Sequence, residues 1–124
     1  MGKKVTKFLE VILGLVLIVF GANGFLQFMT PPQFNSAASD FLGALFATGY
    51  IFPLMSIIWI IAGILLLIHK ARAFAVILIF PISINLMLFH LALDSAQIVI
   101  PLVVFLINVY LIWAYFKVYR PLFK

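Results

Sequence analysis

Apolar residues dominate four long runs of this chain, and short polar segments separate them. The runs cover about residues 8–28, 51–69, 72–93 and 97–119, and each is close to the ~20 residues with which a helix crosses a hydrocarbon core. A shorter apolar stretch at about 36–48 follows Pro31 and Pro32, which interrupt any continuous helix. The pattern predicts one all-α membrane domain over residues 1–124. Its expected architecture is a four-transmembrane-helix bundle with a short extra outer-face helix between spans one and two.

The third run, 72–93, carries more polar groups than a lipid-facing helix tolerates. At about 100° per residue, Ser83, His90 and Asp94 share one face, whereas Asn85 points to nearly the opposite side. Polar side chains are unfavourable against lipid, so both faces should meet protein or trapped water. We therefore predict an interior helix. Pro81 should kink it by leaving a carbonyl without a donor, and Ser83 is placed to help repair that gap.

The first and fourth runs also have specific faces. Gly14, Gly21 and Gly24 lie in one stripe of the first run, where small residues let another helix approach closely. Glu10 sits at its inner boundary, either as an interfacial carboxylate paired with Lys7 or a basic residue near the C-terminus, or as a proton-handling group. In the fourth run, polar residues at spacings of 7 and 4 predict a seam toward the bundle: Asn108, Tyr115 and Tyr119.

Helix-capping signals bound the shorter elements. Asn35 or Ser36 can cap the 36–48 helix, and Gly49 supplies a stop before Pro53 opens the next run. Asp94 or Ser95 can cap the start of the fourth run.

Composition and charge fix the class and the topology. The chain is 67% hydrophobic and 9% charged, far outside the range of soluble domains. Its eight Lys and Arg residues fall in three segments that four spans would place on one side: Lys3, Lys4 and Lys7; Lys70 and Arg72; Lys117, Arg120 and Lys124. Because basic loops stay cytoplasmic, we expect a multi-pass membrane protein with both termini inside. The basic residues are scattered at the flanks of the predicted helices and form no nucleic-acid-recognition motif, which argues against nucleic-acid binding.

The residues offer little catalytic chemistry. The chain has no cysteine, which excludes disulfides, thiolate nucleophiles and cysteine metal sites. The two histidines, His69 and His90, belong to opposite membrane faces, so no metal site is predicted. No nucleotide-binding loop, nucleophile elbow or pair of carboxylates is present, and no catalytic residue is predicted.

The outer half of the predicted bundle gathers residues that could line a small-molecule pocket. A quinone would suit it, since quinone carbonyls need hydrogen-bond donors and the tail needs lipid. The candidate ligand-binding residues are Asn23, Gln27, Trp59, Asn85, Phe89, His90 and Asp94. The alternative is structural: His90 and Asp94, one turn apart, form a hydrogen-bonded pair that locks helices together. Asn23 and Asn85 lie at matching depth and are expected to be neighbours.

Four stretches resemble the DoxX family of small four-helix bacterial membrane proteins. They are LGLVLIVFGANGF from Leu13, FLGALFATGYIFPL from Phe41, INLMLFHLALD from Ile84 and YLIWAYFKVYRPLF from Tyr110. The resemblance implies the four-helix fold, a location in the bacterial inner membrane, and an association with quinone-linked oxidoreductases and oxidative-stress defence. Family members often have a Lys after the Asn of span one and a Glu in span two, where this chain has Gly24 and Trp59. A small and a large residue in place of an opposite-charge pair indicate a compensated exchange, which argues against a charge-dependent mechanism.

These features together predict an accessory or quinone-binding component of a membrane oxidoreductase or stress-defence system, without catalytic activity of its own. Its partners would be the lipid bilayer and either a membrane oxidoreductase or further copies of the chain. The alternative is a purely structural interaction subunit without a ligand. A small transporter is a weaker alternative, because the chain has only four predicted spans and no visible inverted repeat.

Overall fold

The computed structural model describes residues 2–26 and 34–123, and all elements in these ranges are helical. The α-helices are α1 (Gly2–Leu26), α2 (Ser36–Ala47), α3 (Ile51–Leu67), α4 (Arg72–Leu93), α5 (Val99–Ala114) and α6 (Phe116–Tyr119). Two 3₁₀ turns complete the described chain, η1 (Ser95–Gln97) and η2 (Arg120–Phe123). The prediction of an all-α fold is confirmed.

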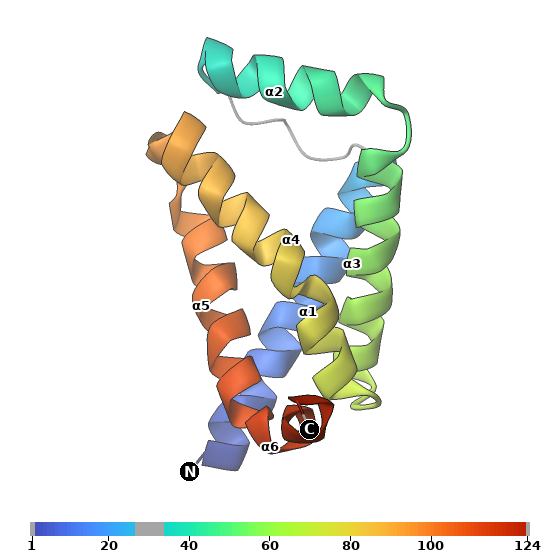
Figure 1. The fold of residues 1–124 in the computed structure, drawn as a ribbon. Helices are drawn as coiled ribbons and strands as arrows, with labels where there is room; N and C mark the ends of the chain where they lie inside the picture. Colours follow the sequence, from blue (N-terminus) through green and yellow to red (C-terminus); the bar gives the residue numbers. More distant parts are fainter. Residues whose placement is uncertain (1, 27–33, 124) are drawn as a thin grey trace.

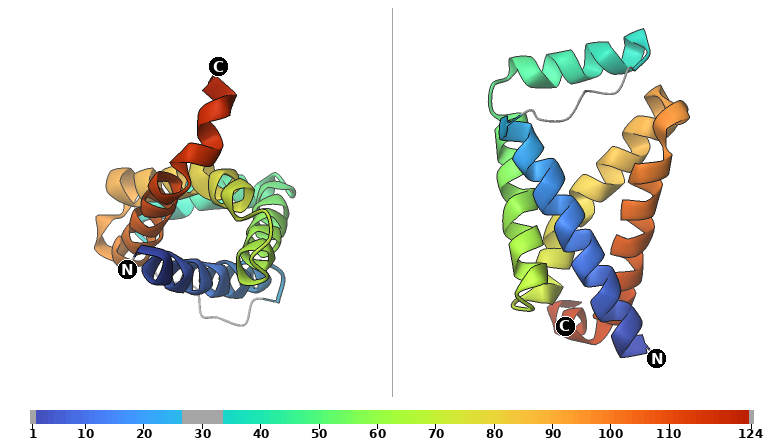
Figure 2. Two further views of the ribbon diagram at one scale, coloured as in Figure 1. Left: turned by 90° about the horizontal axis from the view of Figure 1, so that it is seen from below. Right: turned by 180° about the vertical axis from the view of Figure 1, so that it is seen from behind.

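The four long helices α1, α3, α4 and α5 run along a common direction, and α2 lies across one end of them (Figure 1). Seen along that direction, they are arranged in a ring in the order α1, α3, α4, α5 (Figure 2). We call the end beneath α2 the outer end. The opposite end, where the N-terminus, the α3–α4 turn and α6 meet, is the inner end.

Glycines allow α1 and α3 to pack closely. A Cβ atom built on Gly63 would lie 2.8 Å from the carbonyl oxygen of Gly14, and one on Gly21 would lie 3.0 Å from the carbonyl oxygen of Ser56. At Gly24 the added Cβ would overlap the Ser56 hydroxyl. The predicted close approach along the glycine stripe is confirmed. Gly24 is thus matched by Ser56, whereas Trp59, one turn further along α3, packs against the apolar core.

A buried polar contact joins α4 to α5. The Ser83 hydroxyl donates to Oδ1 of Asn108 over 2.9 Å, and Nδ2 of Asn108 donates to the Val76 carbonyl over 3.0 Å. Asn108 is fully buried and Ser83 is 3% exposed. Since α4 continues through Pro81, Asn108 supplies a donor one turn before the proline. Ser83 was predicted to help repair the proline gap, but it donates to Asn108, and Asn108 in turn satisfies the Val76 carbonyl.

Helix boundaries agree with the sequence patterns except at the start of the first helix and in the fourth run. The bounds of α4 match the predicted span 72–93, and those of α2 and α3 lie within two residues of the predicted ends. Asn35 caps α2 by accepting from the Ala38 amide over 2.9 Å, and Gly49 follows α2 with a φ of 77°, as predicted. The first helix begins six residues earlier than expected, at Gly2.

The fourth run, predicted as a span over 97–119, is not one continuous helix. Helix α5 ends at Ala114, and the following segment 116–123 is bent away from it by 67°. Two tyrosines, one at the bend and one beyond it, are bound to other elements and hold the segment in this direction. The Tyr115 hydroxyl donates to Glu10 on α1, and the Tyr119 hydroxyl donates to the Ala73 carbonyl on α4 over 2.5 Å.

Two helices, α1 and α4, are long and apolar enough to cross a membrane. The number rises to four if two bent pairs each count as one span: α2 with α3, which are bent by 88°, and α5 with the segment 116–123.

Candidate functional site

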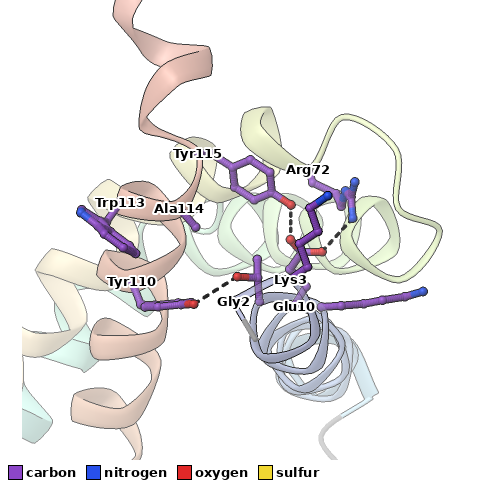
Figure 3. Close-up of a pocket in the computed structure, with 10 residues that line it drawn as sticks. Gly2, Lys3, Glu10, Arg72, Tyr110, Trp113, Ala114 and Tyr115 are labelled. Carbon is purple, nitrogen blue, oxygen red and sulfur yellow. Dashed lines mark hydrogen bonds and ion pairs between the residues drawn. The ribbon is translucent and has the colours of Figure 1, made fainter.

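A cavity among the described residues opens at the inner end, between the first turns of α1 and the last turns of α5. Its volume is about 680 Å³. Polar side chains from three elements line it, together with Gly2, Trp113 and Ala114: Lys3, Thr6, Lys7 and Glu10 from α1, Arg72 from α4, and Tyr110 and Tyr115 from α5 and its end. Figure 3 shows Glu10, Arg72 and Tyr115 converging on one side, with Tyr110 and Trp113 on the other.

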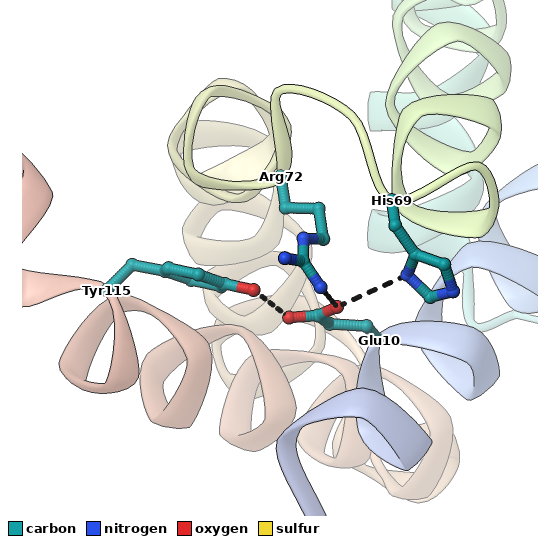
Figure 4. A network of polar contacts seen from close by, with 4 residues as sticks. All are labelled: Glu10, His69, Arg72 and Tyr115. Carbon is teal, nitrogen blue, oxygen red and sulfur yellow. Dashed lines mark hydrogen bonds and ion pairs between the residues drawn. The ribbon is translucent and has the colours of Figure 1, made fainter. Parts of the chain in front are cut away.

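Glu10 is the central charged group of this cavity and is fully buried. Nη1 of Arg72 donates to its Oε2 over 3.3 Å, and the Tyr115 hydroxyl donates to its Oε1 (Figure 4). Nδ1 of His69 lies 3.9 Å from Oε2, which is too long for a hydrogen bond but close enough for a charged imidazole to attract the carboxylate. One carboxylate therefore joins α1, the α3–α4 turn and the end of α5.

The α3–α4 turn delivers His69 and Arg72 through an uncommon backbone conformation. The Lys70 amide donates to the Leu65 carbonyl over 3.1 Å and the His69 amide to the Leu66 carbonyl over 3.3 Å, which is the Schellman pattern of helix ends. His69 occupies the position of this motif that glycine usually takes, with a φ of 58°, and Ala71 follows with a φ of 49°. Side chains are disfavoured there by about 1–2 kcal/mol, and such strain is often found at functional sites.

The Tyr115 hydroxyl stays protonated beside the carboxylate. Tyr115 follows the last residue of α5. The ordinary pKa of a tyrosine hydroxyl is about 10. The phenol is therefore a hydrogen-bond donor at any physiological pH.

A second polar contact closes the cavity on the α5 side. The hydroxyls of Thr6 and Tyr110 lie 3.1 Å apart and form a hydrogen bond between α1 and α5, in which either hydroxyl can be the donor. Either hydroxyl can turn its remaining proton or lone pair toward a bound molecule.

An apolar groove lies between the same two helices, nearer the outer end. It has a volume of about 230 Å³ and an entirely apolar lining: Ile12, Leu13, Val16 and Phe20 of α1, and Val99, Ile100, Val103, Val104 and Ile107 of α5. These residues continue, at helical spacings of three and four, the faces that line the cavity. We call the cavity and groove together the α1–α5 seam.

The outer residues predicted from the sequence are only partly brought together. Phe89 and His90 are buried, and the Phe34 ring packs edge-on to both. Nδ1 of His90 lies 2.9 Å from the Leu86 carbonyl in its own helix. Asp94 accepts instead from the backbone amides of Asn35 over 3.2 Å and of Ala96 over 3.3 Å. The predicted His90–Asp94 hydrogen bond is thus replaced, within the described ranges, by contacts of each residue with backbone groups.

The other members of the predicted outer pocket are scattered. Asn85 is exposed on α4, so the prediction that protein or trapped water covers this face of the helix stays a prediction. Asn23 is half-buried near the end of α1, and its predicted contact with Asn85 stays a prediction. Trp59 is part of the packing around the core. Gln27 lies outside the described residues.

The sequence contained a partial signal for the inner site, in Glu10 and in the polar residues of the fourth run. Glu10 was expected to pair with Lys7 or a C-terminal basic residue, but its partners are Arg72 and Tyr115. The polar stripe of Asn108, Tyr115 and Tyr119 was predicted to face the bundle, and all three residues do bind other elements. A buried carboxylate at the level of two inward-facing tyrosines was the combination that could have indicated the site.

Comparison with protein-family models, with curated proteins and with solved structures found no match for this chain.

Proposed function

We propose that this chain is a four-span membrane protein with both termini in the cytoplasm, which binds a quinone-like molecule as an accessory component of a membrane oxidoreductase or stress-defence system. The DoxX resemblance suggests the system. The observation that carries the proposal is the α1–α5 seam, where a cavity lined by hydrogen-bonding groups continues into an apolar groove.

The seam suits a ligand with a polar head and an apolar tail. A quinone head has two carbonyl acceptors and no donor. The cavity offers donors to it from the Tyr110 hydroxyl and the ammonium groups of Lys3 and Lys7, while Arg72 and Tyr115 are engaged by Glu10. The groove offers the isoprenoid tail an apolar surface that leads from the cavity along α1 and α5. We therefore place the ligand at the inner end and not among His90, Asp94 and Asn85.

Quinone titration of the purified protein tests this proposal. Full-length protein in nanodiscs is titrated with a short-tailed and a long-tailed ubiquinone, and binding is followed by quenching of tryptophan fluorescence. Val103→Trp should fill the groove and weaken long-tailed binding at least tenfold. Val109→Trp is its control, since Val109 is similarly exposed on α5 (40% against 49%) but does not line the groove. Tyr110→Phe should weaken binding of both ligands.

The outcomes separate the sites and the functions. Loss of binding in His90→Leu, with Val103→Trp and Tyr110→Phe unaffected, would place the ligand in the outer cluster. Absence of binding to ubiquinones and menaquinones alike would overturn the ligand proposal.

A structural interaction subunit is the second candidate function. It is favoured by the Glu10 cluster, which fastens three segments of the chain together without any ligand. Affinity purification in mild detergent tests it. A stoichiometric membrane partner that is retained equally by wild type and Tyr110→Phe, in a protein that binds no quinone, would support this function.

A further inference from the structure

The segment Phe116–Phe123, which we call the C-terminal arm, points away from the rest of the molecule. It comprises α6 and η2 and leaves α5 at an angle of 67°. Viewed from the inner end, it extends outward beyond the ring of α1, α3, α4 and α5 (Figure 2). Most of its length therefore has no packing surface within the described chain.

Two tyrosines attach the arm to the rest of the molecule, whereas its large apolar side chains are exposed. Tyr119 is 5% exposed and binds the Ala73 carbonyl, and Tyr115 at the bend binds Glu10. In contrast, four large apolar side chains of the arm are 52–81% exposed: Phe116, Val118, Leu122 and Phe123. Such a concentration of exposed apolar groups marks a surface that meets a lipid or protein partner.

Charge identifies the partner. The arm contributes Lys117 and Arg120, both exposed, and no acidic residue. The same end of the molecule carries Lys3, Lys4, Lys7 and Lys70 on its surface, while its carboxylate, Glu10, is buried and engaged by Arg72. Exposed aromatic and aliphatic side chains interleaved with cations are the combination that enters the headgroup layer of an anionic leaflet.

We propose that the C-terminal arm lies in the plane of the membrane and binds anionic phospholipids of the inner leaflet. Its apolar side chains enter the region between headgroups and acyl chains, and Lys117 and Arg120 extend to the phosphates. The bend at Tyr115 sets the arm in this plane, and the Tyr119–Ala73 hydrogen bond holds it there. This inference is independent of the quinone proposal.

A single tryptophan on the arm tests the inference. The full chain carrying Trp59→Phe, Trp113→Phe and Leu122→Trp is placed in nanodiscs in which either phosphatidylglycerol or phosphatidylcholine, at equal mole fractions, carries bromine on its acyl chains. We expect the indole to be quenched by both lipids and more strongly by brominated phosphatidylglycerol. Each cation near an anionic surface strengthens binding to that surface about fivefold. The double change Lys117→Gln with Arg120→Gln should therefore abolish the preference for phosphatidylglycerol. Lys70→Gln, at the same end but outside the arm, should leave it unchanged.

The alternative outcomes would overturn the inference in distinguishable ways. Equal quenching by the two lipids would mean insertion without selection of charge. An indole that no bromolipid quenches would place the arm in water or against protein. In the latter case, emission that shifts with the number of chains per nanodisc would assign the arm to a contact between copies.

Discussion

His69 occupies a backbone position that favours glycine, and this leads to a prediction about its side chain. We expect His69→Gly to be more stable than His69→Ala by about 1 kcal/mol, because glycine adopts a φ of 58° without a steric penalty and alanine does not. Neither variant has the imidazole, so the comparison isolates the backbone term. Chemical unfolding in mixed micelles measures both. Equal stabilities would show that this turn relaxes without a penalty.

Comparison of His69→Ala with wild type then isolates the imidazole. At 3.9 Å from the carboxylate and one-third exposed, His69 should contribute less than about 1 kcal/mol.

Glu10 should matter more than any exposed carboxylate. Glu10→Gln removes the charge that balances Arg72, and we expect it to lower the free energy of unfolding by about 1–3 kcal/mol. This is less than for a fully buried pair, because the Arg72 side chain is 36% exposed. Asp40→Asn is the matched control, since Asp40 is exposed on α2 and should leave stability unchanged. Equal effects of the two changes would show that the Glu10 cluster contributes nothing specific.

At the scale of single residues, the sequence identified which side chains are unusual but not which residues they contact. Glu10, Asn108, Tyr115 and His90 were all singled out by their polarity within apolar runs. Spacing along one helix gives the face of a residue, whereas its partner depends on the rotation and tilt of the neighbouring helix. His90 and Asp94 show the limit clearly: they share a face as predicted, yet each binds backbone groups.

Substitution of two glycines by alanine should affect stability differently, because only Gly63 lies where α1 packs against α3. Gly63→Ala should destabilise the protein by about 1–3 kcal/mol, because its Cβ would lie 2.8 Å from the Gly14 carbonyl oxygen and 2.7 Å from Cγ1 of Ile18. Gly43→Ala on α2 meets nothing within 4 Å and should be neutral or stabilising by up to about 1 kcal/mol through helix propensity. Thermal unfolding in one detergent compares them. A neutral Gly63→Ala would show that the two helices separate easily.

Helix positions were largely predictable because apolar length, prolines and capping residues are local signals. The exception, the bend after Ala114, depends on contacts with Glu10 and Ala73, which are distant in sequence. Nothing within the run 97–119 signals a break at that point, since Pro121 comes only after the bend. A tertiary contact thus overrides a locally uninterrupted apolar pattern.

The whole molecule has one charged end, and its orientation can be measured directly. The chain lacks cysteine, so single cysteines report without background. In intact cells, an impermeant maleimide should label Ala37→Cys, which is exposed at the outer end, and should not label Lys70→Cys, which is exposed at the inner end. The distribution of cations favours this orientation.

Permeabilised cells provide the control for that experiment, because both cysteines should then react. Labelling of Lys70→Cys but not of Ala37→Cys in intact cells would show that the protein has the opposite orientation in the membrane. It would also remove the basis for assigning the C-terminal arm to the cytoplasmic leaflet.

The contacts of Glu10 have a consequence for the order in which the protein is made. Glu10 enters the membrane region with the first helix, but its partner Arg72 is synthesised 62 residues later and its partner Tyr115 105 residues later. The carboxylate therefore gains its second partner only when the chain is almost finished. A chain that ends just before Tyr115 would therefore have its four long helices complete, but it would lack the hydroxyl that binds Glu10 at the inner end.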